Sequence, residues 1–157
     1  MRVGTPAESF CTTIWLYSVM GLGADMYRQQ ILEHYKRPHH YGSIESPDVV
    51  HTGQNPSCGD EITMELRFDA DDEIVEAAFS GDGCAISQAA ASMLTDRLIG
   101  MSRQELEALD TAYVTEMLGV EISPMRIKCA VLSRQVAQDA AALDAGAADI
   151  EQTSTED

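Results

Sequence analysis

The most constraining feature of this sequence is an alternation of apolar and polar side chains from Glu61 to Phe68. Successive side chains of a strand point to opposite faces, so this period of two predicts a strand with one buried face. The acidic stretch "DADDE" follows, and the next segment, "IVEAAFS", is typical of a second strand. Two such segments joined by a short turn predict an antiparallel hairpin. The apolar positions of the first strand are Ile62, Met64, Leu66 and Phe68.

The segment before the hairpin predicts a helix from Asp25 to Lys36. Asp25 is a favourable N-cap residue, and Pro38 ends the helix because proline cannot continue it. The loop "RPHHYGSIESP" follows, and "DVVHTG" predicts a short first strand, which brings the sheet to three strands. The apolar positions of this helix are Tyr27, Ile31, Leu32 and Tyr35.

Helices dominate the chain after the hairpin. We expect one over residues 84–100, a short one capped by Ser102 with Glu105 in a capping box, one over 111–118, and a long one over 125–143. This order indicates an α+β fold, a small antiparallel three-stranded sheet with helices packed on it.

Three segments make up the predicted domain organisation. Residues 25–143 form one domain, preceded by an N-terminal extension over residues 1–24 and followed by an acidic, disordered tail over 144–157. The apolar stretch "FCTTIWLYSVMGLG" in the extension has the length of a signal-peptide core, but only Arg2 precedes it and no small-residue cleavage site closes it. We therefore expect translation to begin at Met20 or Met26.

The net charge of this 157-residue chain is −16, and its only lysines are Lys36 and Lys128. Such a field repels nucleic acid and anionic membranes, so neither is an expected partner. No apolar run approaches the roughly 18 residues that span a bilayer. An acid-rich, lysine-poor surface suits a cytoplasmic protein that stays soluble in high salt, and we expect a halophilic host.

The four cysteines are Cys11, Cys58, Cys84 and Cys129, of which Cys11 falls in the extension. The other three lie near predicted element boundaries. Cys84 and Cys129 lie near helix starts, where unpaired N–H groups and the helix dipole favour the thiolate that attacks sulfur and binds soft metals. Cys58 precedes a strand, and Asp60, two residues on in an extended chain, points to the same side. The alternative is three buried structural cysteines.

The histidines carry a weaker signal. His39 and His40 lie in the predicted loop, where a metal site is possible but a pair of exposed side chains is the simpler interpretation. His34 lies on the first helix, where we expect it near the polar face.

Four motifs in order resemble the U-type scaffolds of iron–sulfur cluster assembly (IscU, SufU and the N-terminal domain of NifU): "YRQQILEHYKRPHHYG", "NPSCGDEITM", "GDGCAISQAAASML" and "RIKCAVL". The resemblance implies a SufE/NifU-like fold. It also implies that Cys58, Asp60, Cys84 and Cys129 together bind a metal or a nascent cluster. As partners it implies a cysteine desulfurase that delivers sulfur, and apo iron–sulfur proteins that receive the cluster.

The chain departs from the family pattern at three places. IscU-type members carry a histidine immediately before the last cysteine, whereas this chain has Lys128 there, as SufU-type members do. A charged lysine ammonium has no lone pair and cannot bind a metal. The insertion that SufU-type members carry between their second and third cysteines is missing. The segment "ISPMRIK" resembles the loop by which IscU is recognised by a DnaK-type chaperone, but Ser123 replaces one of its two prolines.

Two functional hypotheses follow. In the first, the protein is not an enzyme but a scaffold that builds a transient [2Fe–2S] cluster from iron and sulfur and releases it, because the hard oxygen of Asp60 holds it less firmly than a thiolate. In the second, zinc occupies the four ligands and the protein is a sulfurtransferase, with Cys129 as the first choice of persulfide acceptor. An inert structural zinc site is the simplest alternative.

Overall fold

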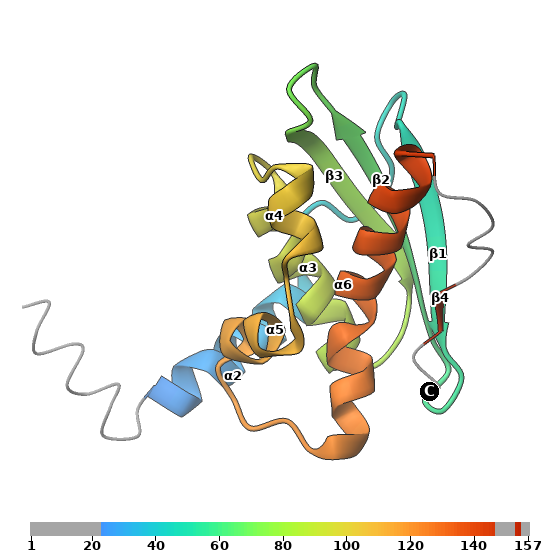
Figure 1. The fold of residues 1–157 in the computed structure, drawn as a ribbon. Helices are drawn as coiled ribbons and strands as arrows, with labels where there is room; N and C mark the ends of the chain where they lie inside the picture. Colours follow the sequence, from blue (N-terminus) through green and yellow to red (C-terminus); the bar gives the residue numbers. More distant parts are fainter. Residues whose placement is uncertain (1–22, 147–152, 155–157) are drawn as a thin grey trace, which may run out of the picture.

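The computed structural model describes residues 23–146 and 153–154. A four-stranded sheet lies on one side, and the five helices of the described residues lie on the other, two of them packed directly on the sheet (Figure 1). The strands are β1 (Val49–Asn55), β2 (Asp60–Phe68), β3 (Ile74–Asp82) and β4 (Thr153–Ser154), and the helices are α2 (Gly23–Lys36), α3 (Ala85–Leu98), α4 (Arg103–Glu107), α5 (Thr111–Leu118) and α6 (Pro124–Asp144).

The predicted three-stranded antiparallel sheet is confirmed. β2 pairs antiparallel with β1 on one side and with β3 on the other. The predicted apolar positions of β2 face the helices, and Ile62, Met64 and Leu66 are fully buried. The short β4 adds a parallel pairing to the outer edge of β1, which the sequence pattern did not indicate.

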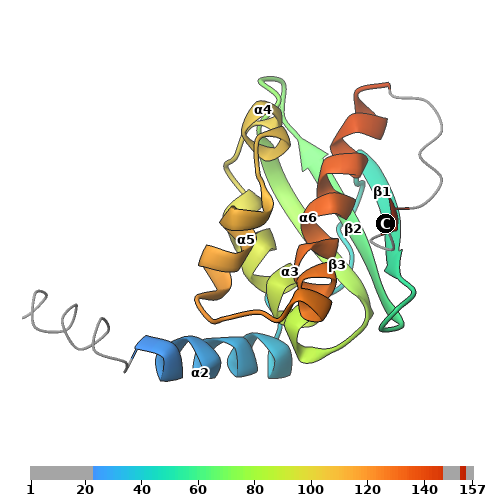
Figure 2. The same ribbon diagram turned by 60° about the horizontal axis from the view of Figure 1, so that its bottom comes forward.

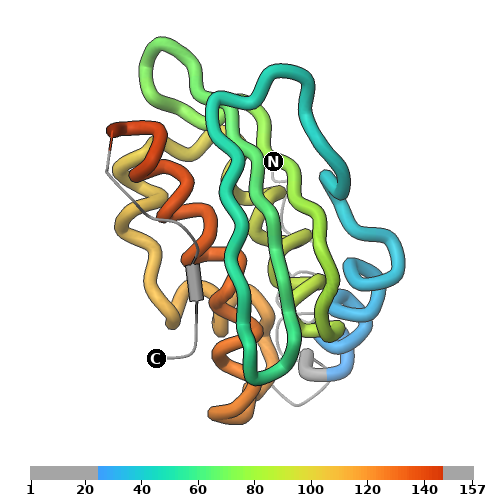
Figure 3. Tube along the Cα trace, turned by 90° about the vertical axis from the view of Figure 1, so that its right-hand side faces the viewer, coloured from blue at the N-terminus to red at the C-terminus, as the bar shows by residue number. Residues whose placement is uncertain are grey.

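The core lies between the sheet and two long helices. α6 packs on β1 and β2, while α3 packs on β3 and on α6, so the two helices lie side by side across the sheet (Figures 2 and 3). Phe79 of β3, Leu94 of α3 and Leu132 of α6 are fully buried there. These helices carry many small side chains, because close packing on a twisted sheet leaves little room for larger ones.

α2 differs from its prediction. It begins at Gly23, so Asp25 lies in its first turn and pairs with Arg28 instead of capping the helix. Its apolar face is mostly exposed, because α2 contacts the body of the fold mainly through α3. Only Ile31 and His34 are buried among residues 25–36.

The later helices agree well with their predictions. Ser102 and Glu105 form the expected capping box, and α5 has the predicted bounds. α6 begins at Pro124 with Ser123 as its N-cap residue. Cys129 is therefore the sixth residue of α6, well inside the helix and not in its first turn.

The predicted extension over residues 1–24 lies outside the described residues except for Gly23 and Ala24, which belong to α2. The predicted disordered tail lies largely outside them too, and both boundaries stay predictions. Among the helices of residues 23–146, none is both long and apolar enough to cross a membrane.

Candidate metal centre

The turn between β1 and β2 presents Cys58 and positions Asp60. The amides of Cys58 and Gly59 donate to the carbonyl oxygen of Asn55 at 3.2 and 2.9 Å. Gly59 has φ +73°, in the left-handed region that glycine adopts at little cost. The prediction of an extended chain here is wrong, because the chain turns tightly between the two residues. The turn leaves Cys58 exposed and buries Asp60 as the first residue of β2.

Cys84 reaches the same place from the junction of β3 and α3. It lies at the start of α3, as predicted, where it is the N-cap residue, and its amide donates to Oδ1 of Asp60 at 2.9 Å. This close approach requires glycine at position 83. A Cβ atom there would lie 2.8 Å from Oδ1 of Asp60 and would collide with Oγ of Ser87.

Cys129 completes the group from the side of α6. Its Sγ lies 3.2 Å from Sγ of Cys58, and Nδ2 of Asn55 donates to it at 3.4 Å. Cys58, Asp60 and Cys129 each offer one ligand atom, and these three atoms lie within 4.8 Å of one another. Figure 1 shows the β1–β2 turn, the start of α3 and the first turns of α6 at the same end of the molecule.

The fourth predicted ligand is linked to this group through its backbone. The thiol of Cys84, which is half-buried, does not belong to the set of ligand atoms within 4.8 Å among the described residues. Its amide nevertheless holds the carboxylate of the group. None of the three cysteines within residues 23–146 forms a disulfide.

The electrostatics of Cys129 differ from the prediction of a thiolate favoured by a helix start. Cys129 is fully buried, and burial raises the pKa of its thiol well above the usual range, with further contributions from Asp60, Cys58 and Cys84. In the metal-free protein the thiol therefore keeps its proton. A metal ion would have to displace that proton, which is the usual coupling of metal binding to proton release.

Asp60 carries the strongest sign of a cation site. Its Oδ2 atom is buried and has no hydrogen-bond partner among the residues that the structure describes. A buried carboxylate oxygen without a partner is costly, and a bound cation removes that cost. The donor set, thiols plus one carboxylate oxygen, suits iron or zinc. The residues present therefore fit a metal ion or a cluster.

Two contacts at this site were not predicted, that of Asn55 with Cys129 and the close approach of Gly83 to Asp60. Asn55 and Gly83 lie inside the motifs "NPSCGD" and "GDGC", so the signal was present. Asn55 opposes Asp60 in the β1–β2 pairing and donates to Cys129, and its own Oδ1 is buried without a partner within the described residues. Lys128, half-buried, directly precedes Cys129 in α6.

The histidines also differ from their prediction. His34 is buried, with 8% of its surface exposed, and not on the polar face of α2. Burial, together with the neighbouring His39, lowers the pKa of its ring, while Asp96 and Glu33 oppose this weakly. His39 and His40 are exposed, as expected.

A comparison with protein families identifies the chain. Residues 26–145 match the model of the NifU-like N-terminal domain. This chain belongs to the NifU-like N-terminal domain family. The resemblance seen in the four motifs and the fold that it implied are thereby confirmed.

Several relatives of this NifU-like domain have assigned functions. The iron–sulfur cluster assembly scaffold protein IscU of Streptococcus pyogenes is 36% identical over 133 residues, which cover 73% of this chain and 82% of the relative. The zinc-dependent sulfurtransferase SufU of Bacillus subtilis is 34% identical over 139 residues, covering 77% of this chain and 92% of the relative.

A solved structure extends the likeness of the NifU-like domain to three dimensions. A crystal structure from Fervidobacterium islandicum AW-1, described as an iron–sulfur cluster assembly scaffold protein for the SUF system, superposes with a TM-score of 0.59 at 35% identity. It covers 71% of this chain and 93% of its own. Two of these three proteins are thus named for iron–sulfur cluster assembly, and the third is named as a zinc-dependent sulfurtransferase.

Proposed function

We propose that this protein is a scaffold for iron–sulfur cluster assembly. It receives sulfur from a cysteine desulfurase, holds a [2Fe–2S] cluster as cargo and passes the cluster to apo-proteins. The ligands are Cys58, Asp60, Cys84 and Cys129. The observation that carries the proposal is the buried, unpartnered Oδ2 of Asp60 beside two thiols that come from separate segments of the chain.

The role of Asp60 follows from its two oxygen atoms. Oδ1 accepts a hydrogen bond from the backbone N–H of Cys84. Oδ2 has no such partner and is therefore the atom that can bind iron. A single hard oxygen binds iron of a sulfur-rich cluster less firmly than a thiolate does. Transfer to an acceptor that offers only thiolates is then favourable, so Asp60 is the ligand that allows release.

The unequal burial of the thiols suggests a direction for the chemistry. Cys58 is exposed on the turn, while Cys129 is fully buried and keeps its proton. Sulfur delivered by another protein reaches Cys58 first. This assigns the entry of sulfur to Cys58 and leaves Cys129 as an inner ligand.

A second candidate function is zinc-dependent sulfur transfer, and the likeness to SufU of Bacillus subtilis favours it. In this reaction the thiolate of Cys58 attacks the terminal sulfur of a desulfurase persulfide. A new S–S bond forms on Cys58, the S–S bond of the donor breaks, and the donor cysteine leaves as a thiolate. Exposure favours Cys58 over Cys129, our first choice from the sequence, as the acceptor.

One experiment separates the two functions. The protein is purified without oxygen, its zinc and iron are measured, and desulfurase, cysteine, a thiol reductant and ferrous iron are added. Growth of visible absorption bands, followed by reconstitution of an apo-ferredoxin, supports the scaffold. Retained zinc with accelerated desulfurase turnover and no visible bands contradicts the scaffold and supports sulfur transfer.

Matched cysteine variants make the result specific. Cys58→Ser should abolish both cluster formation and sulfur transfer, because it removes an exposed ligand and the proposed entry point. Cys11→Ser, outside the matched family region, should change neither. A Cys58→Ser protein that still assembles and transfers clusters at the wild-type rate would overturn the proposed ligand set.

The remaining predictions about cellular context are part of this proposal. We expect a cytoplasmic protein of a halophilic host, without nucleic-acid or membrane partners. Recognition by a DnaK-type chaperone would involve Pro124 and its neighbours, which form the first turn of α6.

A further inference from the structure

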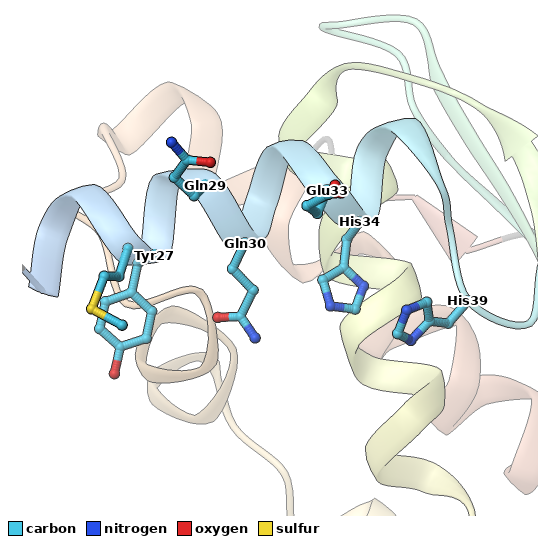
Figure 4. A pocket seen from close by; sticks show the side chains of 7 residues that line it. Tyr27, Gln29, Gln30, Glu33, His34 and His39 are labelled. Carbon is cyan, nitrogen blue, oxygen red and sulfur yellow. The ribbon is translucent and has the colours of Figure 1, made fainter. Parts of the chain in front are cut away.

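A second group of potential ligands lies where α2 meets α3, away from the cysteines in sequence. It contains His34 of α2, His39 of the following loop and Asp96 of α3. Each offers one ligand atom, and the three atoms lie within 4.8 Å of one another. The two imidazole rings lie side by side, with centroids 4.4 Å apart (Figure 4).

We propose that His34, His39 and Asp96 bind a divalent first-row transition-metal ion, zinc or ferrous iron, through nitrogen and oxygen donors. Two imidazoles and one carboxylate form a donor set that suits both ions and leaves coordination positions open. The site does not depend on the proposed role of the cysteines. The histidine site shares no ligand with the cysteine site, and its nitrogen and oxygen donors are harder than thiolate sulfur.

The hydrogen bonds of the metal-free protein show how the site is prepared. His39 Nδ1 lies 2.6 Å from Oδ2 of Asp96, so a hydrogen bond joins the two groups. Ligand atoms around a zinc ion with bonds of about 2.0–2.1 Å lie roughly 3.3 Å apart. A small widening of this pair therefore makes room for a metal ion in place of the hydrogen bond.

Two further residues hold the ligands in place. His40 Nε2 bonds to the other oxygen of Asp96, Oδ1, at 2.9 Å and orients the carboxylate. Ser92 Oγ, buried in α3, lies 2.7 Å from Nδ1 of His34. The same oxygen accepts a hydrogen bond from the backbone N–H of His39, also at 2.7 Å. Such outer partners fix the orientation of metal ligands in many sites.

The space beside the rings can supply the remaining coordination positions. A cavity of about 510 Å³ runs along α2 and is lined by His34 and His39. Figure 4 shows Gln30 and Glu33 on the same stretch of α2 as His34. Water or one of these oxygen donors could complete the shell, and the net charge of −16 attracts cations to the surface.

The competing interpretation is that this group only fastens α2 to α3 by hydrogen bonds. The two interpretations differ in metal stoichiometry. With cobalt as a spectroscopic probe for zinc, the full-length protein should bind two equivalents under anaerobic conditions. One should show thiolate-to-cobalt charge-transfer absorption, and the other should show only weak visible bands of nitrogen and oxygen ligands.

Variants assign the second equivalent. His39→Gln and Asp96→Asn should each weaken it by about 100-fold or more, since each removes a ligand. His40→Gln should weaken it by about tenfold, because it removes only an outer partner. His51→Gln and Asp71→Asn, matched controls outside the group, should leave it unchanged, and metal-free thermal unfolding identifies any variant that fails to fold.

A single cobalt equivalent in the wild-type protein, or a second equivalent unaffected by His39→Gln and Asp96→Asn, would overturn the site. Displacement of cobalt by an equal concentration of magnesium would also overturn it, because magnesium prefers oxygen ligands alone. Zinc and ferrous iron titrated in competition with cobalt show which ion binds more tightly. Retention of the thiolate bands in every variant keeps this test separate from that of the cysteine site.

Discussion

Asp60 and Cys84 are joined by a hydrogen bond of 2.9 Å from the backbone amide of Cys84 to Oδ1 of Asp60. This bond connects the first residue of β2 to the N-cap residue of α3, 24 positions away. It fixes the carboxylate by one oxygen and leaves the other oxygen buried without a partner among the described residues. The arrangement therefore predicts that Asp60 binds a metal through a single oxygen.

The first prediction concerns release of the cargo. Asp60→Cys replaces the single oxygen ligand by a thiolate, so a reconstituted [2Fe–2S] cluster should persist about tenfold longer, which corresponds to about 1.4 kcal/mol in the barrier to loss. The measurement is the decay of visible absorption in the presence of a chelator, together with the rate of transfer to apo-ferredoxin.

Glu61→Gln is the matched control for Asp60. Glu61 is the next acid in β2, is exposed and accepts a bond from Gln54, so its change should leave the cluster lifetime as it is. Faster cluster loss from the Asp60→Cys protein than from the wild type would contradict the account of Asp60 as the weak ligand.

A second prediction tests the close approach at Gly83. Gly83→Ala adds a methyl group 2.8 Å from Oδ1 of Asp60 and against Oγ of Ser87, so it should displace the carboxylate. We expect metal affinity to fall at least about tenfold while the fold is kept, since disturbing the support of a ligand costs that much. Metal titration and circular dichroism measure the two effects.

Rescue makes this prediction specific. Ser87→Ala in the same protein removes the Oγ atom and gives the new methyl group room to move away from Asp60, so part of the affinity should return. Ser87→Ala alone should bind metal like the wild type. Undiminished metal binding by the Gly83→Ala protein would show that the carboxylate is not held in the observed position.

Local patterns in the sequence predicted the fold well, and the reason is physical. The alternation over Glu61–Phe68 predicted β2 to within one residue, because the same alternation decides which side chains are buried. The capping box of Ser102 and Glu105 is likewise a property of four consecutive residues. The ordered motifs also contain the four proposed ligands, and the structure brings the ligand atoms of Cys58, Asp60 and Cys129 within 4.8 Å of one another.

Features that depend on distant contacts could not be predicted in this way. His34 is buried because it meets Ser92, which is 58 residues away, and nothing in the pattern of α2 indicates that contact. Cys129 is buried because α6 begins at Pro124 and packs on β1 and β2. The prediction that the helix dipole would favour a thiolate at Cys129 was therefore wrong, because burial raises the pKa of this thiol more than the dipole lowers it.

The third prediction follows from the raised pKa of Cys129. In the unfolded chain a thiol ionises near pH 8.5, whereas the buried thiol keeps its proton. The metal-free protein should therefore keep its full stability below about pH 8.5 and lose up to about 1.4 kcal/mol per pH unit above it. Urea unfolding at a series of pH values measures this.

Substitutions test whether Cys129 causes this loss of folding stability at alkaline pH. Cys129→Ala should remove most of this slope, while Cys58→Ser, at the exposed partner, should retain most of it. Equal slopes in the wild-type and Cys129→Ala proteins would show that another group causes the loss.

The last prediction concerns acid and the buried His51 of β1, of which 4% is exposed. Burial lowers the pKa of its ring, and Asp139 of α6 partly opposes this. The unfolded chain binds a proton near pH 6.5 that the folded protein does not bind, so stability should be complete above that pH and fall below it, by up to about 1.4 kcal/mol per pH unit.

His51→Gln should reduce this dependence of stability on pH. Asp139→Asn should extend the loss of stability to lower pH, because it removes the charge that favours protonation of His51. Urea unfolding between pH 7 and 5 compares the three proteins, and a slope that His51→Gln leaves unchanged would assign the acid loss to other groups.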